Sequence, residues 1–508
     1  MNLKIHDTKI YFLAILVGIV SAGICLPFRY LLSKIGEVRE WIFYPGHPFY
    51  FYFIVPFLIY AIMLFVYLLV RRNPLSRGSG MPQTKALLNG RLTYTTPWKS
   101  FFVKFFGGLL SLGSGLSLGR EGSSVQMGSL AGDWISKIFH VRSARRKHLI
   151  AAGAGAGVSA AFTAPLASSL LILESLERFY LPLTAITTLL AGLAAGVLAQ
   201  FFFPTDIYNA IIVRQPDLNL WQLLLILSVM ALFISLFGKL FSYLLLKVKV
   251  LYEGSKINVY IKLAYVAGIT CLVGYFFPTI VGGDQAYLIS ESNILTSGLL
   301  YMGIVILVIS LFTILSNAVQ FPGGIFLPMM TVGGLCGKFF CQLMAEAGYL
   351  TTVSTGYFVL IGMSAFFISV VRTPLTGFIL ISEMTGHYEV FFPALWVGII
   401  TYFLTELMKV KPMDQLLYDF MLQHLPDDYP KRMIVSIDIA ADSYLDGKTP
   451  ATLKLPERCI IVGIYRGPEA YRFVDGFSLE PGDLVDIEID SDDLEKIYQP
   501  LVSMAISS

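Results

Sequence analysis

The chain has 508 residues and a formal net charge of +3, with 56% hydrophobic and only 14% charged residues. A mean hydropathy of +0.69 excludes an ordinary soluble globular protein and indicates an all-α, polytopic membrane protein. The sequence has no HExxH or CxxC pattern, so it predicts no metal ion, no cofactor and no redox chemistry.

Apolar windows follow one another along most of the chain. They cover residues 10–31, 50–70, 99–118, 123–139, 148–174, 181–203, 219–247, 258–277, 297–317, 324–345, 355–382 and 390–409. Several contain Gly or Pro and are too short to cross ~30 Å of hydrocarbon at about 1.5 Å per residue. We therefore expect many tilted and partial helices. The first window has no small-residue cleavage site, so it predicts a retained helix rather than a signal peptide.

Basic residues gather in two loops of this apolar part, at 71–77 and 142–147. By the positive-inside rule, these loops face the cytoplasm. We expect the N-terminus and the C-terminal region on the same, cytoplasmic side of the membrane.

The stretch GSGLSLGREGSSVQMGSLAG, residues 113–132, places Arg120 and Glu121 in an apolar, glycine-rich setting. Its pattern predicts a helix from Ser123 toward Ile138. Glu121 would then stand at a helix N-terminus, where backbone N–H groups lack partners and the helix dipole favours negative charge. The stretch predicts an anion site that already holds a carboxylate; a helix cap paired with Arg120 is the structural alternative.

The two halves of the chain are similar to each other. Residues 119–132 recur as 324–337 at a constant offset of 205, and residues 163–175 recur as 372–384 at an offset of 209. The loop after the first motif is basic, whereas its counterpart at 344–356 has no Lys or Arg. This asymmetry predicts inverted repeats, spanning roughly 10–205 and 215–425, with a site near the midplane where they meet.

Three segments offer helix N-termini with small residues: GSGMP at 78–82, GREGS at 119–123 and GGIFLP at 323–328. Each one alone reads as a helix-packing turn. Together they predict a site of backbone N–H groups, without a cationic side chain, that suits a weakly held anion such as chloride. The first repeat offset pairs Glu121 with Phe326. A carboxylate there competes with the anion, and its protonation would link anion passage to proton binding.

Taken together, GSGMPQTKALL, GREGSSVQMG, GGIFLPMM and LLYDF resemble the signatures of the CLC family of chloride channels and chloride/proton antiporters over residues 1–425. The resemblance implies the inverted-repeat CLC fold and a homodimer with one anion pore per subunit. It also implies site residues. Ser79 and Tyr418 would bind the central anion by hydroxyl, the amides of Ile325 and Phe326 would complete that site, amides around Gly122 would form the outer site, and Glu121 would be the gating glutamate.

Two departures from the family pattern bear on function. Ser123 stands where the family usually has proline, which we expect to be mild. Ser175 stands where many family antiporters carry an inner proton-transfer glutamate, with Glu174, Glu177 or water as substitutes. Ser79 occupies a position where serine accompanies chloride in the family. The resemblance implies chloride transport, with H⁺/Cl⁻ exchange gated by Glu121 as the favoured function and a passive chloride channel as the alternative.

Other classes of function find little support. An intramembrane serine hydrolase would need a partner histidine in a buried segment, which the sequence does not offer. A cation pathway would need a carbonyl filter such as TVGYG, which is absent from the sequence. We therefore expect a transporter of chloride and protons, not an enzyme.

The C-terminal region changes character after a linker at 426–432. Residues 431–508 hold 8 Lys+Arg against 14 Asp+Glu, which argues against nucleic-acid binding. Strand-like runs at 433–440, 459–466 and 484–490 and a final helix predict a small cytoplasmic α+β domain over 433–508. This domain resembles the TrkA-C type, as a dimerisation module or as the binding site of a small solute.

Overall fold

The protein is described here by a computed structural model. It covers residues 5–44, 46–48, 50–92, 94, 96–177, 182–204, 211–282, 298–350, 354–424, 432–449, 452–453, 455, 459–466, 469–471, 477–490 and 494–505.

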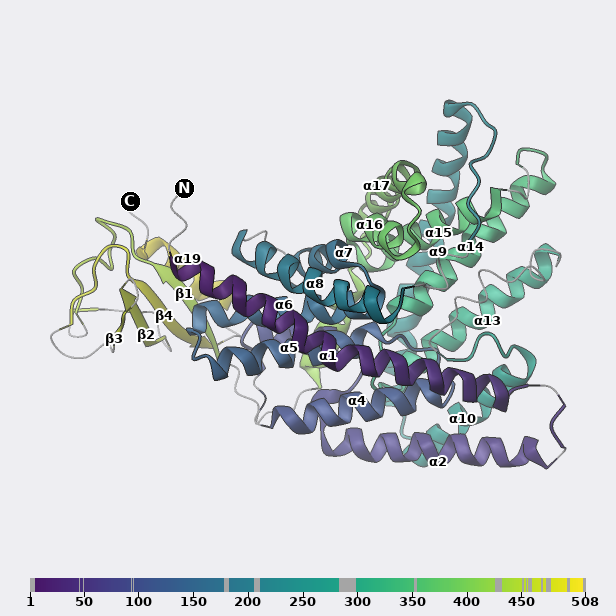
Figure 1. The fold of residues 1–508 in the computed structure, drawn as a ribbon, viewed down its shortest axis with the longest axis horizontal. Coiled ribbons are helices and arrows are strands. Elements are labelled where there is room, and N and C mark those ends of the chain that lie inside the picture. The colour runs from purple at the N-terminus through teal and green to yellow at the C-terminus, as the bar shows by residue number, and fades with distance from the viewer. Residues whose placement is uncertain are drawn as a thin grey trace.

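Most of the described chain is a bundle of helices of very unequal length (Figure 1). In order they are α1 (Ile5–Ile42), α2 (Phe51–Arg72), η1 (Pro74–Ser76), α3 (Met81–Leu88), α4 (Pro97–Gly113), α5 (Glu121–Ile138), α6 (Ser143–Phe162), α7 (Pro165–Leu171), η2 (Ile172–Glu177), α8 (Pro182–Phe202), α9 (Leu220–Gly254), α10 (Val259–Phe276), α13 (Leu299–Ala318), α14 (Phe326–Glu346), α15 (Thr355–Val371), α16 (Pro374–Thr385), η5 (Tyr388–Val390), α17 (Phe391–Leu407) and α18 (Met413–Gln423).

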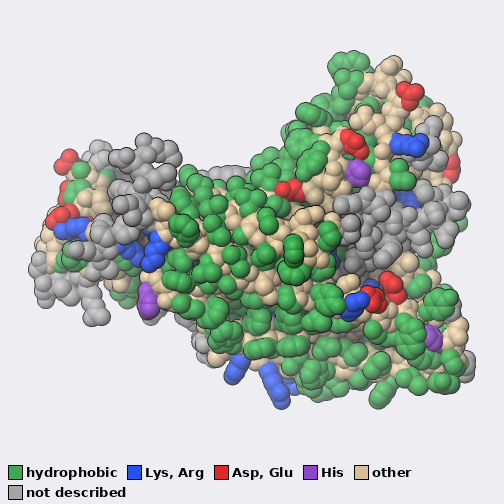
Figure 2. All heavy atoms as spheres, in the orientation of Figure 1, with side chains coloured by type: hydrophobic (Ala, Val, Ile, Leu, Met, Phe, Trp, Pro, Cys, Tyr) green, Lys and Arg blue, Asp and Glu red, His purple; other side chains and the backbone are tan. Residues whose placement is uncertain are grey.

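Eight of these helices, counted over the described residues, are long and apolar enough to cross a membrane. Others, such as the eight-residue α3, are far too short to do so at about 1.5 Å per residue. Figure 2 shows hydrophobic side chains over most of this part of the surface. An apolar exterior of this kind fits a lipid environment, and the predicted mixture of spanning and partial helices is confirmed.

The repeat seen in the sequence appears as two similar helix pairs. In the first half, Gly128 of α5 lies against the Gly153 carbonyl of α6, so closely that a side chain there would overlap it. In the second half, Gly333 of α14 lies in the same way against the Gly362 carbonyl of α15. Small residues allow this close approach of helix backbones inside a membrane protein. Glycines that align between the two repeats therefore allow the close packing of helices in both halves.

A separate four-stranded antiparallel sheet forms the C-terminal domain. Its strands are β1 (Arg432–Asp438), β2 (Ile460–Arg466), β3 (Glu469–Tyr471) and β4 (Leu484–Asp490), in the order β1-β4-β2-β3, followed by helix α19 (Leu494–Ala505). Ile464, Val485 and Ile487 of the sheet and Leu501 of α19 form part of a shared core. The three predicted strands and the final helix are confirmed. The short strand β3 lies where the sequence indicated only a turn. It pairs with β2 over just three positions, too few to give a strand pattern in the sequence.

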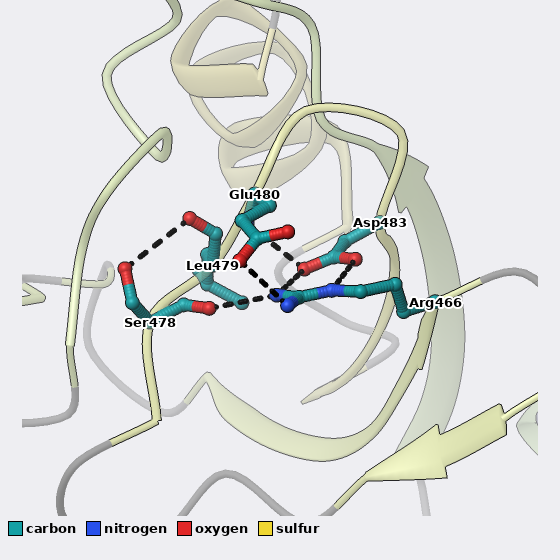
Figure 3. A network of polar contacts seen from close by, with 5 residues as sticks. All are labelled: Arg466, Ser478, Leu479, Glu480 and Asp483. Atoms are coloured by element: carbon teal, nitrogen blue, oxygen red, sulfur yellow. Dashed lines mark hydrogen bonds and ion pairs between the residues drawn. The ribbon is translucent and has the colours of Figure 1, made fainter.

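An ion-pair network closes the loop between β3 and β4 (Figure 3). Arg466, the last residue of β2, donates to both carboxylate oxygens of Asp483, at 2.9 and 3.0 Å, and to the Ser478 carbonyl at 2.9 Å. Its remaining guanidinium nitrogen lies 2.7 Å from Glu480. The hydrogen bond to Asp483 is the main reason that the pKa of Arg466 is raised above its usual value.

The sheet lies at one end of the helical part, beside α6 (Figure 1). Arg142 directly precedes α6, and its guanidinium stands 5.1 Å from the centre of the Tyr465 ring on β2. This is the geometry of a cation–π contact. It joins the C-terminal domain to one of the two basic loops.

Candidate functional site: three helix N-termini around Glu121

Three glycine-rich loops meet in the interior, each directly before a helix. Gly119 and Gly324 exchange backbone hydrogen bonds of 2.8 and 2.5 Å, so the two repeats join here as a single β-bridge. The Gly78 N–H donates to the Gln320 carbonyl at 2.9 Å, and the Gly323 N–H donates to the Gly78 carbonyl at 3.3 Å. The loops therefore bring the N-termini of α3, α5 and α14 to one place, as the three motifs predicted.

Glu121 is the first residue of α5 and is almost completely buried, with 1% of its surface exposed. Its Oε1 accepts a hydrogen bond of 2.7 Å from the Phe326 N–H at the start of α14. Its Oε2 has no hydrogen-bond partner among the described residues. The carboxylate thus occupies the helix N-terminus of the opposite repeat, where unpaired N–H groups favour an anion.

Close backbone approach surrounds this carboxylate. A side chain at Gly324 would overlap Glu121 Oε1, and one at Gly122 would overlap the Ser79 carbonyl. Ile325, 2% exposed, is the residue directly before α14. The structure therefore brings Glu121, Gly122, Ile325 and Phe326 together, with the Ser79 backbone in contact with Gly122.

Ser79 lies just before α3 and faces a small cavity of about 50 Å³ between α3, α9 and α18. Its hydroxyl is buried and makes no hydrogen bond within the described chain. Burying a hydroxyl costs free energy unless a ligand or another group forms a hydrogen bond with it. The Ser79 hydroxyl is therefore available to donate to an anion. Gly80, with a φ of 93°, lets the chain turn from Ser79 into the helix.

Two buried lysines border this region, contrary to the expectation that no cationic side chain stands there. Lys104 of α4 is fully buried, and its Nζ donates to the Gly78 carbonyl at 2.6 Å. Lys249 of α9, 5% exposed, lines the same cavity as Ser79. Both lie in mostly apolar stretches, Lys104 in SFFVKFFGG and Lys249 in LLLKVKVLY. A lysine buried in such a stretch is costly unless it has a specific role, and this signal is present in the sequence.

The structure does not bring Tyr418 into this group. Its hydroxyl accepts a hydrogen bond of 3.4 Å from Asn89 Nδ2, and Asn89 follows the last residue of α3 whereas Ser79 precedes the helix. The eight-residue helix separates the two ends by ~12 Å. Leu417, the residue before Tyr418, lines the Ser79 cavity instead.

Ser175 and Glu174 lie on η2, a π-helical continuation of α7. The Ser175 hydroxyl donates to the carboxylate of Asp414 on α18, a residue that the motifs did not single out. Glu174 accepts hydrogen bonds from the backbone N–H groups of Leu375 and Thr376 at 3.2 and 2.8 Å. Both of its oxygens are therefore engaged at the N-terminus of α16. The side chain of Glu177 lies outside the described residues.

No group of three or more His, Cys, Asp or Glu side chains that could hold a metal ion occurs among the residues described. The groups that the structure places at this site are backbone N–H groups, hydroxyls, buried lysines and carboxylates. Such a set can bind an anion and can hold or release a proton.

Comparison with known proteins gives consistent matches. The family model of the voltage gated chloride channel matches residues 62–406, and the TrkA-C domain model matches residues 434–502. The H(+)/Cl(-) exchange transporter ClcA of Vibrio cholerae serotype O1 is 32% identical over 429 residues, covering 81% of this chain and 89% of the relative.

Solved structures share the fold. A slow cyanobacterial Cl-/H+ antiporter gives a TM-score of 0.74 at 24% identity, covering 82% of this chain and 98% of that one. A CLC-type fluoride/proton antiporter gives a TM-score of 0.67 at 20% identity, covering 80% of this chain and 97% of that one.

Proposed function

The chain belongs to the voltage-gated chloride channel (CLC) family, and from this premise we propose that it exchanges chloride for protons across a membrane, with Glu121 as the gate that couples them. One observation carries the proposal: the Phe326 N–H is bonded to Glu121 Oε1 at 2.7 Å. An anion and this carboxylate compete for the same donor. Protonation removes the negative charge, weakens the attraction to the helix N-terminus and frees the donor for chloride.

Chloride is the proposed anion because a serine hydroxyl, that of Ser79, is free at the cavity. Backbone N–H groups and a hydroxyl bind a monovalent anion weakly enough for rapid exchange. Fluoride and nitrate are the rival anions, and competition experiments with both would separate them.

A passive chloride channel remains the second candidate. It is favoured by the absence of a carboxylate at position 175, where the resemblance places the inner proton glutamate. In this alternative, Glu121 would gate chloride flow without carrying protons across the membrane.

Purified protein in liposomes distinguishes these functions. A chloride gradient is imposed across the vesicles, the voltage is clamped with valinomycin and potassium, and chloride and lumenal pH are followed together. An exchanger moves protons uphill at the expense of the chloride gradient. Chloride flux with no proton movement would leave the channel as the function.

The assembly and setting are part of the same proposal. We expect a homodimer with one pore per subunit in a bacterial or archaeal inner membrane, with both the N-terminus and the C-terminal domain in the cytoplasm. Light scattering in detergent measures the assembly, and labelling of single cysteines at the exposed ends of helices measures the orientation. For the C-terminal domain we propose one of two roles, either dimerisation or the binding of a small solute.

A further inference from the structure

Asp414 is a buried acidic side chain in the first turn of α18, away from the glycine-rich site. It is 5% exposed, as is Ser175. The Ser175 hydroxyl donates to the Asp414 carboxylate across 239 positions of sequence. A carboxylate is rarely buried without a structural or functional reason.

Both residues line a cavity of about 850 Å³. At ~30 Å³ per water molecule, this space holds on the order of twenty waters or more. Glu406, Lys409 and Lys411 on its wall are exposed, so the cavity opens to the surface. Water can therefore bring protons from solution to the Asp414 carboxylate.

Three other carboxylates line this wall. Glu174 is bonded to the N-terminus of α16, and Glu406 pairs with Arg372. Asp419, which is partly buried, accepts from Gln415 Nε2 at 2.7 Å. Asp414 differs from all three because it is buried and is held by the hydroxyl of Ser175.

Positive side chains lie close to Ser175 and along the wall of the cavity that Ser175 and Asp414 share. Lys85 of α3 donates to the Ser175 carbonyl at 3.3 Å and to Gln415 Oε1 at 3.1 Å. Arg372, Lys409 and Lys411 stand on the cavity wall. Positive charge near a carboxyl group favours its ionised form, so these side chains favour release of a proton that Asp414 has taken up.

Buried polar groups continue from Lys85 toward Glu121. Thr84, the preceding residue of α3, lies with its hydroxyl 3.3 Å from the Ser129 hydroxyl of α5. Ser129 donates to the Gln126 carbonyl at 2.8 Å, and Gln126 lies beside Gly80, on the same helix as Glu121. Buried polar side chains thus occupy part of the contact between α3 and α5, the helix that begins at Glu121.

We propose that Asp414 is the inner proton acceptor of this chain, with Ser175 as the hydroxyl that positions its carboxylate. A proton passes from cavity water to a carboxylate oxygen of Asp414, forming the neutral acid, and then leaves toward Glu121, which restores the carboxylate. The acid function that the resemblance places at position 175 is supplied instead by its hydrogen-bond partner. The proposal rests on the exchange function proposed above.

The test compares variants in liposomes, with chloride flux and proton flux measured in the same vesicles. A positioned proton-transfer group contributes about a hundredfold or more, so Asp414→Asn should lower proton flux at least tenfold while chloride flux continues. Asp419→Asn, on the same helix and the same cavity, is the matched control and should alter neither flux. The double variant Asp414→Asn, Ser175→Glu returns a carboxylate to the pocket and should recover proton flux.

The outcomes separate the two proposals. If the wild-type protein moves chloride but no protons, the exchange function fails. If the wild type exchanges and Asp414→Asn retains its proton flux, the Asp414 inference is overturned. Loss of both fluxes in a folded Asp414→Asn protein overturns it too. Should that variant not fold, Ser175→Ala gives the second measurement: proton flux should fall with chloride flux retained, and an unchanged proton-to-chloride ratio would contradict the proposal.

Discussion

Glu174 and Glu383 each cap a helix that belongs to the other half of the protein. Glu174 accepts from the Leu375 and Thr376 N–H groups at the start of α16. Glu383 accepts from the Leu166 and Ala167 N–H groups at the start of α7, at 3.1 and 2.8 Å. Both helices begin with proline, so their next N–H groups are the ones that need partners. The two carboxylates therefore link the two repeats by hydrogen bonds in both directions.

Neutralising either cap should lower stability to a similar extent. Hydrogen bonds to a charged group contribute about 1.5–3 kcal/mol, so Glu174→Gln and Glu383→Gln should each cost roughly 2 kcal/mol of folding stability. The measurement is the unfolding temperature in detergent. Liposome assays supply the functional comparison, in which both variants should retain coupled exchange. Selective loss of proton flux in Glu174→Gln alone would instead identify Glu174 as a proton carrier.

The repeat made part of the site predictable from the sequence. The offset of 205 that pairs Glu121 with Phe326 also names the N–H that holds the carboxylate, because helices related by a repeat meet at equivalent positions. Tyr418 was expected at the site only from the family resemblance of LLYDF, and in the structure its hydroxyl accepts a hydrogen bond from Asn89. The Asp414 contact depends on tertiary packing between distant segments, which periodicity and motifs do not specify.

The Arg466 network should stabilise the C-terminal domain independently of the pore. Asp483 is fully buried, and Arg466 is about one-third exposed. Arg466→Met leaves the Asp483 carboxylate without its main partner, and we expect a loss of about 2 kcal/mol in the domain. Denaturant unfolding followed by fluorescence from a probe on this domain measures the loss. Arg466→Lys should recover only part of it, because lysine cannot bond both oxygens in the same plane.

The pH dependence of this network follows from the arginine. Its raised pKa in the folded protein means that the contribution is complete below the unfolded pKa and is lost only as pH rises through still more alkaline values. Between pH 6 and about 10, the difference between wild type and Arg466→Met should therefore show no decline from titration of Arg466. A clear fall of the difference within that range would show that another group controls the loop.

Replacing the gate should separate the two fluxes. Glu121→Gln keeps the shape of the side chain but removes both its negative charge and its ability to carry a proton. We expect chloride flux to continue, proton flux to vanish and the dependence of chloride flux on pH to flatten. Simultaneous recording of lumenal pH and chloride in liposomes checks this, with Glu121→Ala as a second neutral variant. If chloride flux also stops in folded protein, the carboxylate is needed for conduction itself, and its assignment as a releasable gate is wrong.

Lys104 should set the affinity for chloride through the loop that carries Ser79. Its Nζ is fully buried and donates to the Gly78 carbonyl at 2.6 Å, so it fixes the loop that carries Ser79. Without this contact the loop must be ordered when chloride binds, and a cost of about 1 kcal/mol, that of a typical hydrogen bond, would weaken the affinity roughly fivefold in Lys104→Met. Calorimetric titration of chloride in detergent measures this. Lys99→Met, on the exposed part of the same helix, is the control and should bind as the wild type does. Equal affinities for all three proteins would show that Lys104 has no influence on the anion site.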